Sequence, residues 1–105
     1  MGFEPLLPDV EHVPFNDLGA AEQAITQETA AFIVEPIQGN SGVAVADPGY
    51  LQGLRKLCDK TGTLLIVDEI QTAGGRTGKW FDHQFENITP DIMPLAKAIG
   101  GGMPL

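Results

Sequence analysis

Short runs of apolar residues recur three times along this chain. They cover residues 30–34, 63–67 and 92–96 and contain almost no polar position. A short apolar run without polar alternation is typical of a strand that is buried inside a sheet. We therefore predict three strands, the first of them covered on both faces.

Two segments between these runs carry apolar residues at helical spacing. The first extends from Asn16, a candidate N-cap, to about residue 27. The second begins at Asp47, which precedes a proline suited to the first helical position, and ends near residue 60, before a C-cap at Gly62. The predicted inner faces consist of Leu18, Ala21 and Ile25, and of Leu51, Leu54, Leu57 and Cys58.

Glycine marks the connecting segments. Residues 37–46 and 71–79 are predicted to be loops, and residues 80–86 to form one or two helical turns. The order of strand, helix, strand, short helix and strand is typical of an α/β fold with a mostly parallel sheet. Residues 1–105 are enough for one small domain or for part of a larger one, and the final GGGMPL segment has the character of a loop and not of a domain boundary.

The composition argues against several classes of function. The net charge is −8, with 14 acidic and 6 basic residues, which argues against a nucleic-acid surface. We find neither a signal peptide nor an apolar stretch of membrane-spanning length, and expect a cytoplasmic protein that contacts no membrane. Cys58 is the only cysteine, and His12 and His83 lack companions at ligand spacing, so no metal site is predicted.

Ionisable residues follow all three predicted strands. They are Glu35, then Asp68 with Glu69, then Lys97. Because ligands of open parallel sheets bind beyond the carboxyl ends of the strands, these side chains are expected to converge on one site. Lys97 suits attack on an aldehyde, but a surface lysine that neutralises the nearby carboxylates is equally compatible with the spacing. Asp68 suits contact with a protonated pyridine nitrogen, or else caps the next loop.

Four motifs extend this interpretation by resemblance. They are VEPIQG at 34–39, LLIVDEIQT at 64–72, GRTGKWF at 75–81 and PDIMPLAKAIGGGMPL at 90–105. In order and spacing they resemble the class III aminotransferases, which are fold-type-I enzymes dependent on pyridoxal 5′-phosphate (PLP). The resemblance implies a βαβαβ segment of the PLP-binding large domain. The motifs are most similar to those of the acetylornithine, ornithine and diamine or 4-aminobutyrate enzymes.

The resemblance also implies roles for individual residues. Lys97 matches the lysine that forms the Schiff base with PLP and then moves the proton during catalysis. Asp68 matches the aspartate paired with the pyridinium nitrogen, Ile70 the aliphatic residue against the ring, and Gln71 the glutamine near the phenolic oxygen. Glu35 matches a supporting glutamate near the site.

Position 40 departs from the family pattern. Members with an EPIQGE motif have a glutamate there, which pairs with a substrate-binding arginine, whereas this chain has Asn40. The implied substrates are an amino acid or terminal amine as donor and a 2-oxo acid as acceptor, in an enzyme that is a homodimer. We expect the 105-residue chain by itself to be inactive. Two alternatives remain: a non-catalytic, self-associating α/β module, and a decarboxylase or racemase that uses the same cofactor.

Overall fold

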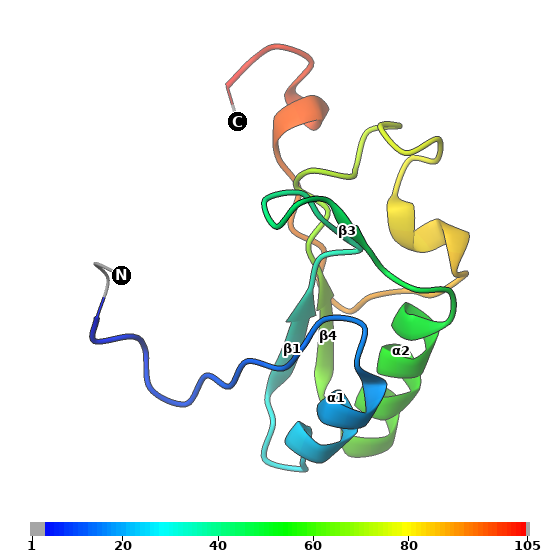
Figure 1. Cartoon of the computed structure of the whole chain (residues 1–105). Coiled ribbons are helices and arrows are strands. Elements are labelled where there is room, and N and C mark those ends of the chain that lie inside the picture. Colours follow the sequence, from blue (N-terminus) through cyan, green and yellow to red (C-terminus); the bar gives the residue numbers. More distant parts are fainter. Residues whose placement is uncertain (1–3, 105) are drawn as a thin grey trace.

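The computed structural model describes residues 4–104, which form two helices, four short strands and two 3-10 turns (Figure 1). Strands β1 (Ala31–Val34) and β4 (Leu64–Val67) pair in parallel, with Ala31 opposite Leu64. The remaining elements are α1 (Leu18–Ala24), β2 (Ile37–Gln38), β3 (Ala44–Val45), α2 (Tyr50–Thr61), η1 (Asp82–Phe85) and η2 (Lys97–Gly100). The α/β class with a parallel sheet is confirmed.

The third predicted strand is only partly formed. Residues 92–96 lie beside β4 in the parallel direction, but they make a single bridge, between Ile66 and Ile92. The amide of Glu69 donates to the carbonyl of Pro94 at 3.2 Å. Because Pro94 has no N–H to donate in return, the ladder stops there. The segment has the position and direction that were predicted, but the predicted length of the strand was wrong.

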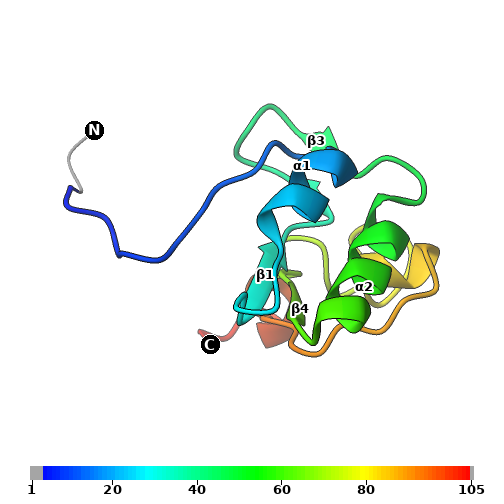
Figure 2. The same cartoon turned by 90° about the horizontal axis from the view of Figure 1, so that it is seen from below.

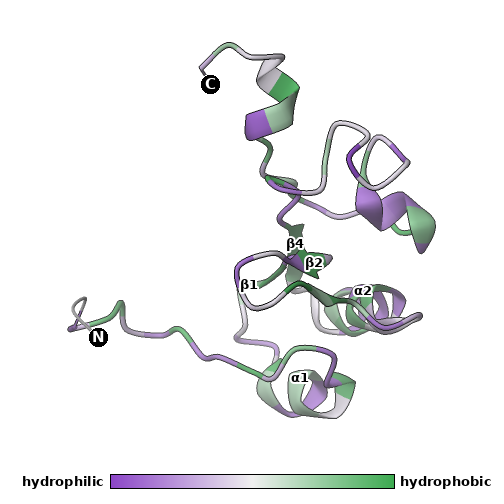
Figure 3. Cartoon of the chain, turned by 45° about the horizontal axis from the view of Figure 1, so that its top comes forward, coloured by the Kyte–Doolittle hydropathy of each residue, from purple (hydrophilic) through white to green (hydrophobic). Residues whose placement is uncertain are grey.

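Both helices pack on the same face of the sheet. They lie next to each other (Figure 2) and enclose a core that includes Ala21, Ile25, Val34, Tyr50, Leu51, Leu54, Cys58, Leu65 and Val67. The opposite face is open, since Ile33 is 64% exposed and Leu64 46%. Figure 3 shows that the sheet itself is hydrophobic. The prediction that the first strand is covered on both faces was therefore wrong for the part of the chain that the structure describes.

Helix α1 begins one residue later than predicted. Its N-cap is Asp17, whose side chain accepts from the amide of Ala20 at 2.9 Å. Asn16 instead adopts a left-handed conformation with φ 62°. Its side chain bonds to the carbonyl of Val45 at 2.9 Å and the amide of Asp47 at 2.8 Å. Asn16 thus fixes the chain before α1 to the chain before α2.

Helix α2 begins at Tyr50, with Gly49 as its N-cap, and not at Asp47. The carbonyl of Asp47 accepts from the amide of Tyr50 at 2.9 Å, which forms a turn before the helix. The cap comes from a distant residue, because the carboxylate of Glu86 accepts from the amides of Gly49 at 3.0 Å and Gln52 at 3.1 Å. A carboxylate is well placed there, near the positive end of the helix dipole.

The loop predictions had mixed outcomes. The segment 37–46 contains the antiparallel ribbon of β2 and β3, where a loop was predicted. The helical turns predicted in 80–86 are present as η1. Among residues 4–104, no helix is both long and apolar enough to cross a membrane.

Candidate functional site

A cleft of about 1060 Å³ runs alongside β1 and reaches the carboxyl ends of the two parallel strands. Glu35, Gln38 and Asp68 line it there, while Phe32 and Val34 contribute apolar surface. The amide of Asp68 donates to the carbonyl of Val34 at 2.8 Å, which brings the two strand ends together. The structure therefore places Glu35 and Asp68 on one cleft, as the strand pattern predicted.

Asp68 is half-buried, and only one of its carboxylate oxygens accepts a hydrogen bond within residues 4–104. Oδ1 accepts from the amide of Ile70 at 2.9 Å, so the side chain does cap the following turn. Oδ2 has no hydrogen-bond partner among residues 4–104. A carboxylate oxygen without a donor at the edge of a cleft suits a cationic N–H group, such as a protonated ring nitrogen. The capping role and the ligand-binding role are therefore compatible.

Ile70 and Gln71 follow Asp68 in the same turn, and both are half-buried. The Gln71 side chain lies against the backbone of Gly39, where a Cβ atom would be only 2.4 Å from Oε1 of Gln71. Asn40, the next residue after Gly39, is exposed. The turn after β2 thus meets the turn after β4, and the glycine of the VEPIQG motif is needed for this close approach.

Lys97 lies apart from the cleft. It is exposed and is the first residue of η2. The 3-10 turn η2, orange in Figure 1, lies beyond the carboxyl end of β4. Its φ of 55° lies in the left-handed region, which costs a residue with a side chain about 1–2 kcal/mol. Lys97 forms no ion pair within residues 4–104. The structure thus brings Lys97 to the same end of the sheet as Asp68, but its side chain does not line the cleft.

The glycine-rich loop supports the Lys97 segment. Gly74 adopts φ +81°, and a Cβ atom there would lie 3.2 Å from Cβ of Ala98. The loop after β4 therefore lies directly against the residue that follows Lys97. This close approach gives the glycine-rich 71–79 loop a packing role.

Glu69 does not join the site at which the sequence placed it. Side chains alternate along a strand, so Leu65, Val67 and Glu69 all point to the helix-covered face, and all three are fully buried. The carboxylate of Glu69 accepts from Oγ1 of Thr72 at 2.6 Å. It also accepts from the amides of Asp82 and His83 and from Nδ1 of His83. This cluster was not predicted, although the alternation of apolar residues before Glu69 indicates that its side chain points inward.

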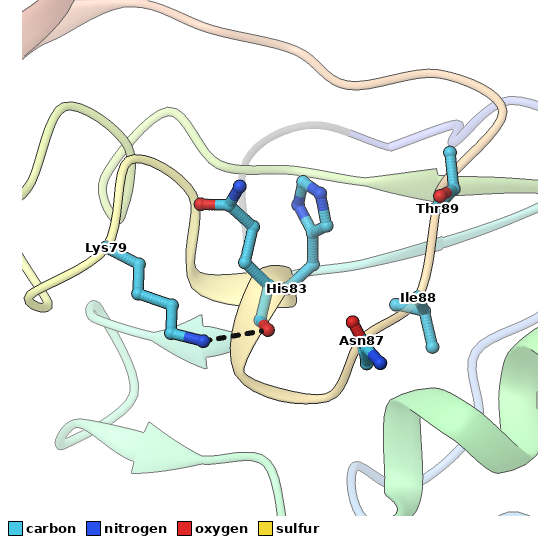
Figure 4. Close-up of a pocket in the computed structure, with 6 residues that line it drawn as sticks. Lys79, His83, Asn87, Ile88 and Thr89 are labelled. Atoms are coloured by element: carbon cyan, nitrogen blue, oxygen red, sulfur yellow. Dashed lines mark hydrogen bonds between the residues drawn. The ribbon is translucent and has the colours of Figure 1, made fainter.

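A second cavity of about 420 Å³ lies beside this cluster (Figure 4). Its lining comes from η1 and the segments on either side of it: Lys79, His83, Gln84, Asn87, Ile88 and Thr89. The amine of Lys79 is held in place, since it donates to the carbonyl of Gln84 at 3.2 Å and lies 4.8 Å from the centre of the Phe85 ring. Burial raises the pKa of the neighbouring Asp82, and so does the charge of Glu69.

Comparison with known proteins gives a consistent result. Residues 2–105 match the family model for class III aminotransferases. The acetylornithine aminotransferase of Methanopyrus kandleri is 54% identical over 98% of this chain and 26% of its own length. That of Rhodobacter capsulatus is 53% identical over 99% of this chain and 26% of its own length. The chain therefore spans about a quarter of the curated relatives it matches.

Solved structures agree with the sequence comparison. The ornithine aminotransferase of Toxoplasma gondii superimposes with a TM-score of 0.94 at 43% identity, covering 98% of this chain and 25% of that one. The acetylornithine aminotransferase of Elizabethkingia anophelis gives a TM-score of 0.83 at 45% identity, covering 88% of this chain and 24% of that one. A further T. gondii structure has partial occupancy of PLP at its active site.

Two comparisons support the family assignment. The family model matches nearly the whole chain, and solved aminotransferases share the arrangement of its strands and helices. The turns that meet at the candidate site, after β2 and after β4, lie within the matched residues. This chain belongs to the class III aminotransferase family.

Proposed function

We propose that this chain supplies one wall of the active site of a PLP-dependent aminotransferase. The enzyme would transfer an amino group from an amino acid or terminal amine to a 2-oxo acid. One observation carries the proposal: the half-buried carboxylate of Asp68 lies on a cleft and keeps one oxygen free of hydrogen bonds within residues 4–104. The names of the relatives favour an ornithine-like donor, with an amine at the end of a short aliphatic chain.

The residues present fit a pyridine cofactor. When bound, PLP supplies an aldehyde carbon and an electron-accepting ring. The carboxylate of Asp68 would hold the proton on the ring nitrogen, because a nearby anion favours the protonated form of a neighbouring base. Ile70 would pack against the ring, and Gln71 would donate its amide N–H to a ring oxygen. Glu35 lines the same cleft and would support this arrangement.

Lys97 would anchor the cofactor covalently and carry the proton in each half-reaction. Its exposed position and the three glycines after it leave the side chain free to reach toward the strand ends. Asn40 would lie near the substrate but carries no charge. An asparagine there cannot form an ion pair with an arginine that holds a substrate carboxylate.

A second candidate is favoured by the position of Lys97. Because this lysine does not line the cleft, and because the chain spans about a quarter of its relatives, the isolated chain could be a non-catalytic module. In either case we expect the isolated chain to have no robust turnover with an amino donor and 2-oxoglutarate. A homodimeric enzyme and a cytoplasmic location stay predictions from family resemblance and composition.

Titration of the purified chain with PLP tests the proposal. We expect a visible absorbance band that is lost in Lys97→Ala and kept in Lys79→Ala, a matched loss of another exposed lysine. Reduction with borohydride, followed by peptide mass analysis, should place the label on residue 97. Labelling spread equally over several lysines, or a band unchanged in Lys97→Ala, would refute cofactor anchoring by this chain and favour the non-catalytic module.

A further inference from the structure

Glu69 is a fully buried carboxylate to which the proposed chemistry assigns no role. An isolated carboxylate is costly to remove from water, so a buried one needs several donors. Glu69 has them from three residues: the hydroxyl of Thr72, the amide of Asp82, and both the amide and the ring of His83. The ring of His83 is itself held, because it stacks on Phe81 at 5.7 Å with an angle of 9° between the planes.

The backbone of Glu69 connects the segments that carry the candidate site. Its amide donates to the carbonyl of Pro94 at 3.2 Å, three residues before Lys97. Its carbonyl accepts from the amide of Ala73 at 2.9 Å, which closes the turn that contains Gln71. Asp68 is its immediate neighbour. One residue therefore contacts the Asp68 turn, the Lys97 segment and η1 at the same time.

We propose that Glu69 is a positioning residue, whose buried carboxylate fixes the orientation of the 68–72 turn and, through that turn, of Asp68 and Gln71. The inference rests on the proposed PLP-binding function. The hydrogen bond from Thr72 is the critical contact, because Thr72 directly follows Gln71 while its hydroxyl reaches back to Glu69. Without this hydrogen bond the 68–72 turn loses its fixed geometry. Part of the free energy of cofactor binding is then used to order the turn, so the affinity is lower.

Three substitutions separate positioning from general stability. Glu69→Gln keeps the shape of the side chain but replaces one acceptor oxygen with a donor. Thr72→Val replaces only the hydroxyl, with a methyl group of similar size. Glu86→Gln is the matched control, because Glu86 is also a carboxylate that accepts from two backbone amides, but at the start of α2.

The dissociation constant of PLP is measured through the Lys97-dependent band, at a temperature where circular dichroism shows every variant to be folded. We expect Glu69→Gln to weaken PLP binding about tenfold, because it replaces a charged hydrogen-bond acceptor. Thr72→Val should weaken binding about threefold, because it removes one hydrogen bond. Glu86→Gln should lower the unfolding temperature without changing the dissociation constant. Wild-type affinity in both Glu69→Gln and Thr72→Val would overturn the proposal.

Hydrogen exchange tests the proposal without the cofactor. If the wild-type chain shows no Lys97-dependent band, the proposed function fails for this chain, and exchange alone decides the role of Glu69. We then expect Thr72→Val to accelerate exchange of the Ile70 amide, which donates to Asp68, several-fold more than exchange of amides within α2. Equal acceleration in both places would mean that Glu69 only stabilises the fold.

Discussion

The contact between Gly39 and Gln71 joins two motifs that are far apart in the sequence. An added Cβ at Gly39 would lie 2.4 Å from Oε1 of Gln71, so one of the two must move. Because Oε1 is at the end of a flexible side chain, we expect Gln71 to rotate away and the backbone to stay in place. The absence of a side chain at position 39 thus determines where the Gln71 amide lies.

We predict that Gly39→Ala and Gln71→Ala are energetically coupled. Gly39→Ala should lower the free energy of unfolding by about 1 kcal/mol in the wild type and by nothing in the Gln71→Ala background, where the clashing atoms are gone. Chemical denaturation of the four proteins measures this. Gly19→Ala, on the exposed side of α1, is the control and should cost nothing in either background. Equal costs of Gly39→Ala in both backgrounds would show that the contact is not tight.

Asp91 makes stability depend on pH. Its carboxylate accepts from the amide of Leu65 at 2.8 Å and from Nη1 of Arg55 at 2.8 Å. The Leu65 hydrogen bond, and then that of Arg55, hold the pKa of Asp91 below its ordinary value of 3.8. A lowered pKa in the folded state stabilises the fold above the unfolded-state pKa, and this contribution is lost as the pH falls through the folded-state value.

We therefore predict that Asp91→Asn is less stable than the wild type at pH 7 and that the difference shrinks below about pH 4. Thermal unfolding across the range from pH 7 to pH 3 measures both proteins. Asp59→Asn is the control: Asp59 also pairs with Arg55, at 2.8 Å, but its side chain is 66% exposed and should contribute less. A difference between Asp91→Asn and wild type that stays constant with pH would contradict the assignment.

Individual site residues differ in how far the sequence could identify them. Asp68 and Glu35 could be placed at one site because both follow parallel strands. The burial of Glu69 could also be predicted, because it continues the alternation of the buried residues Leu65 and Val67. The prediction that Glu69 lies at the same site as Asp68 did not take this alternation into account. The left-handed backbone of Lys97 could not be predicted, since nothing in its neighbouring residues requires it.

At the scale of elements, the ends of α2 show why some boundaries could be predicted and others could not. Its C-cap, Gly62, has φ 76° and its amide donates to the carbonyl of Cys58, as the local sequence indicated. Its start depends on Glu86, which is 37 residues away from Gly49 and approaches only in the folded chain. A signal within one turn of the helix is visible in the sequence, whereas a distant cap is not.

Helix α2 also provides most of the apolar surface that covers the sheet. Leu54 is fully buried on its inner face, so we predict that Leu54→Ala lowers the free energy of unfolding by about 2–5 kcal/mol. That loss is comparable with the whole stability of a small domain. Circular dichroism during thermal unfolding should show a much lower midpoint, or no folded baseline. Leu64→Ala is the control on the open face, and an equal loss in both variants would show that α2 does not form the core.

At the scale of the whole molecule, the described chain is a two-layer unit with an extended lead-in. The radius of gyration is 14.4 Å, against about 13 Å for a compact chain of this length. Residues 4–12, all exposed, form this lead-in, and its last part, residues 9–12, borders the cleft beside β1 (Figure 1). The class of fold could be predicted from the order of apolar runs. The single covered face could not, because an apolar strand has the same composition whether or not a second layer is present.

The open face of the sheet leads to a prediction about association. Ile33, Leu64 and Ile92 are 64%, 46% and 46% exposed and belong to adjacent parallel strands or their continuation. Neighbouring apolar side chains on an exposed sheet favour contact with a second copy of the chain, while the net charge of −8 opposes it. We therefore expect weak self-association that strengthens when salt screens the charge.

Sedimentation velocity of the isolated chain at low and high salt measures this, with Ile33→Lys expected to keep the chain monomeric in both. Leu6→Lys is the matched control, because Leu6 is 67% exposed in the lead-in and the substitution changes the net charge equally. Each added lysine changes the net charge from −8 to −7, so charge alone would strengthen association in both variants, and an equal reduction in both would mean that the open face is not the specific contact surface. If neither does, the copies meet elsewhere. Only a selective effect of Ile33→Lys identifies the uncovered sheet as the contact surface, which follows from a fold whose helices lie on one side.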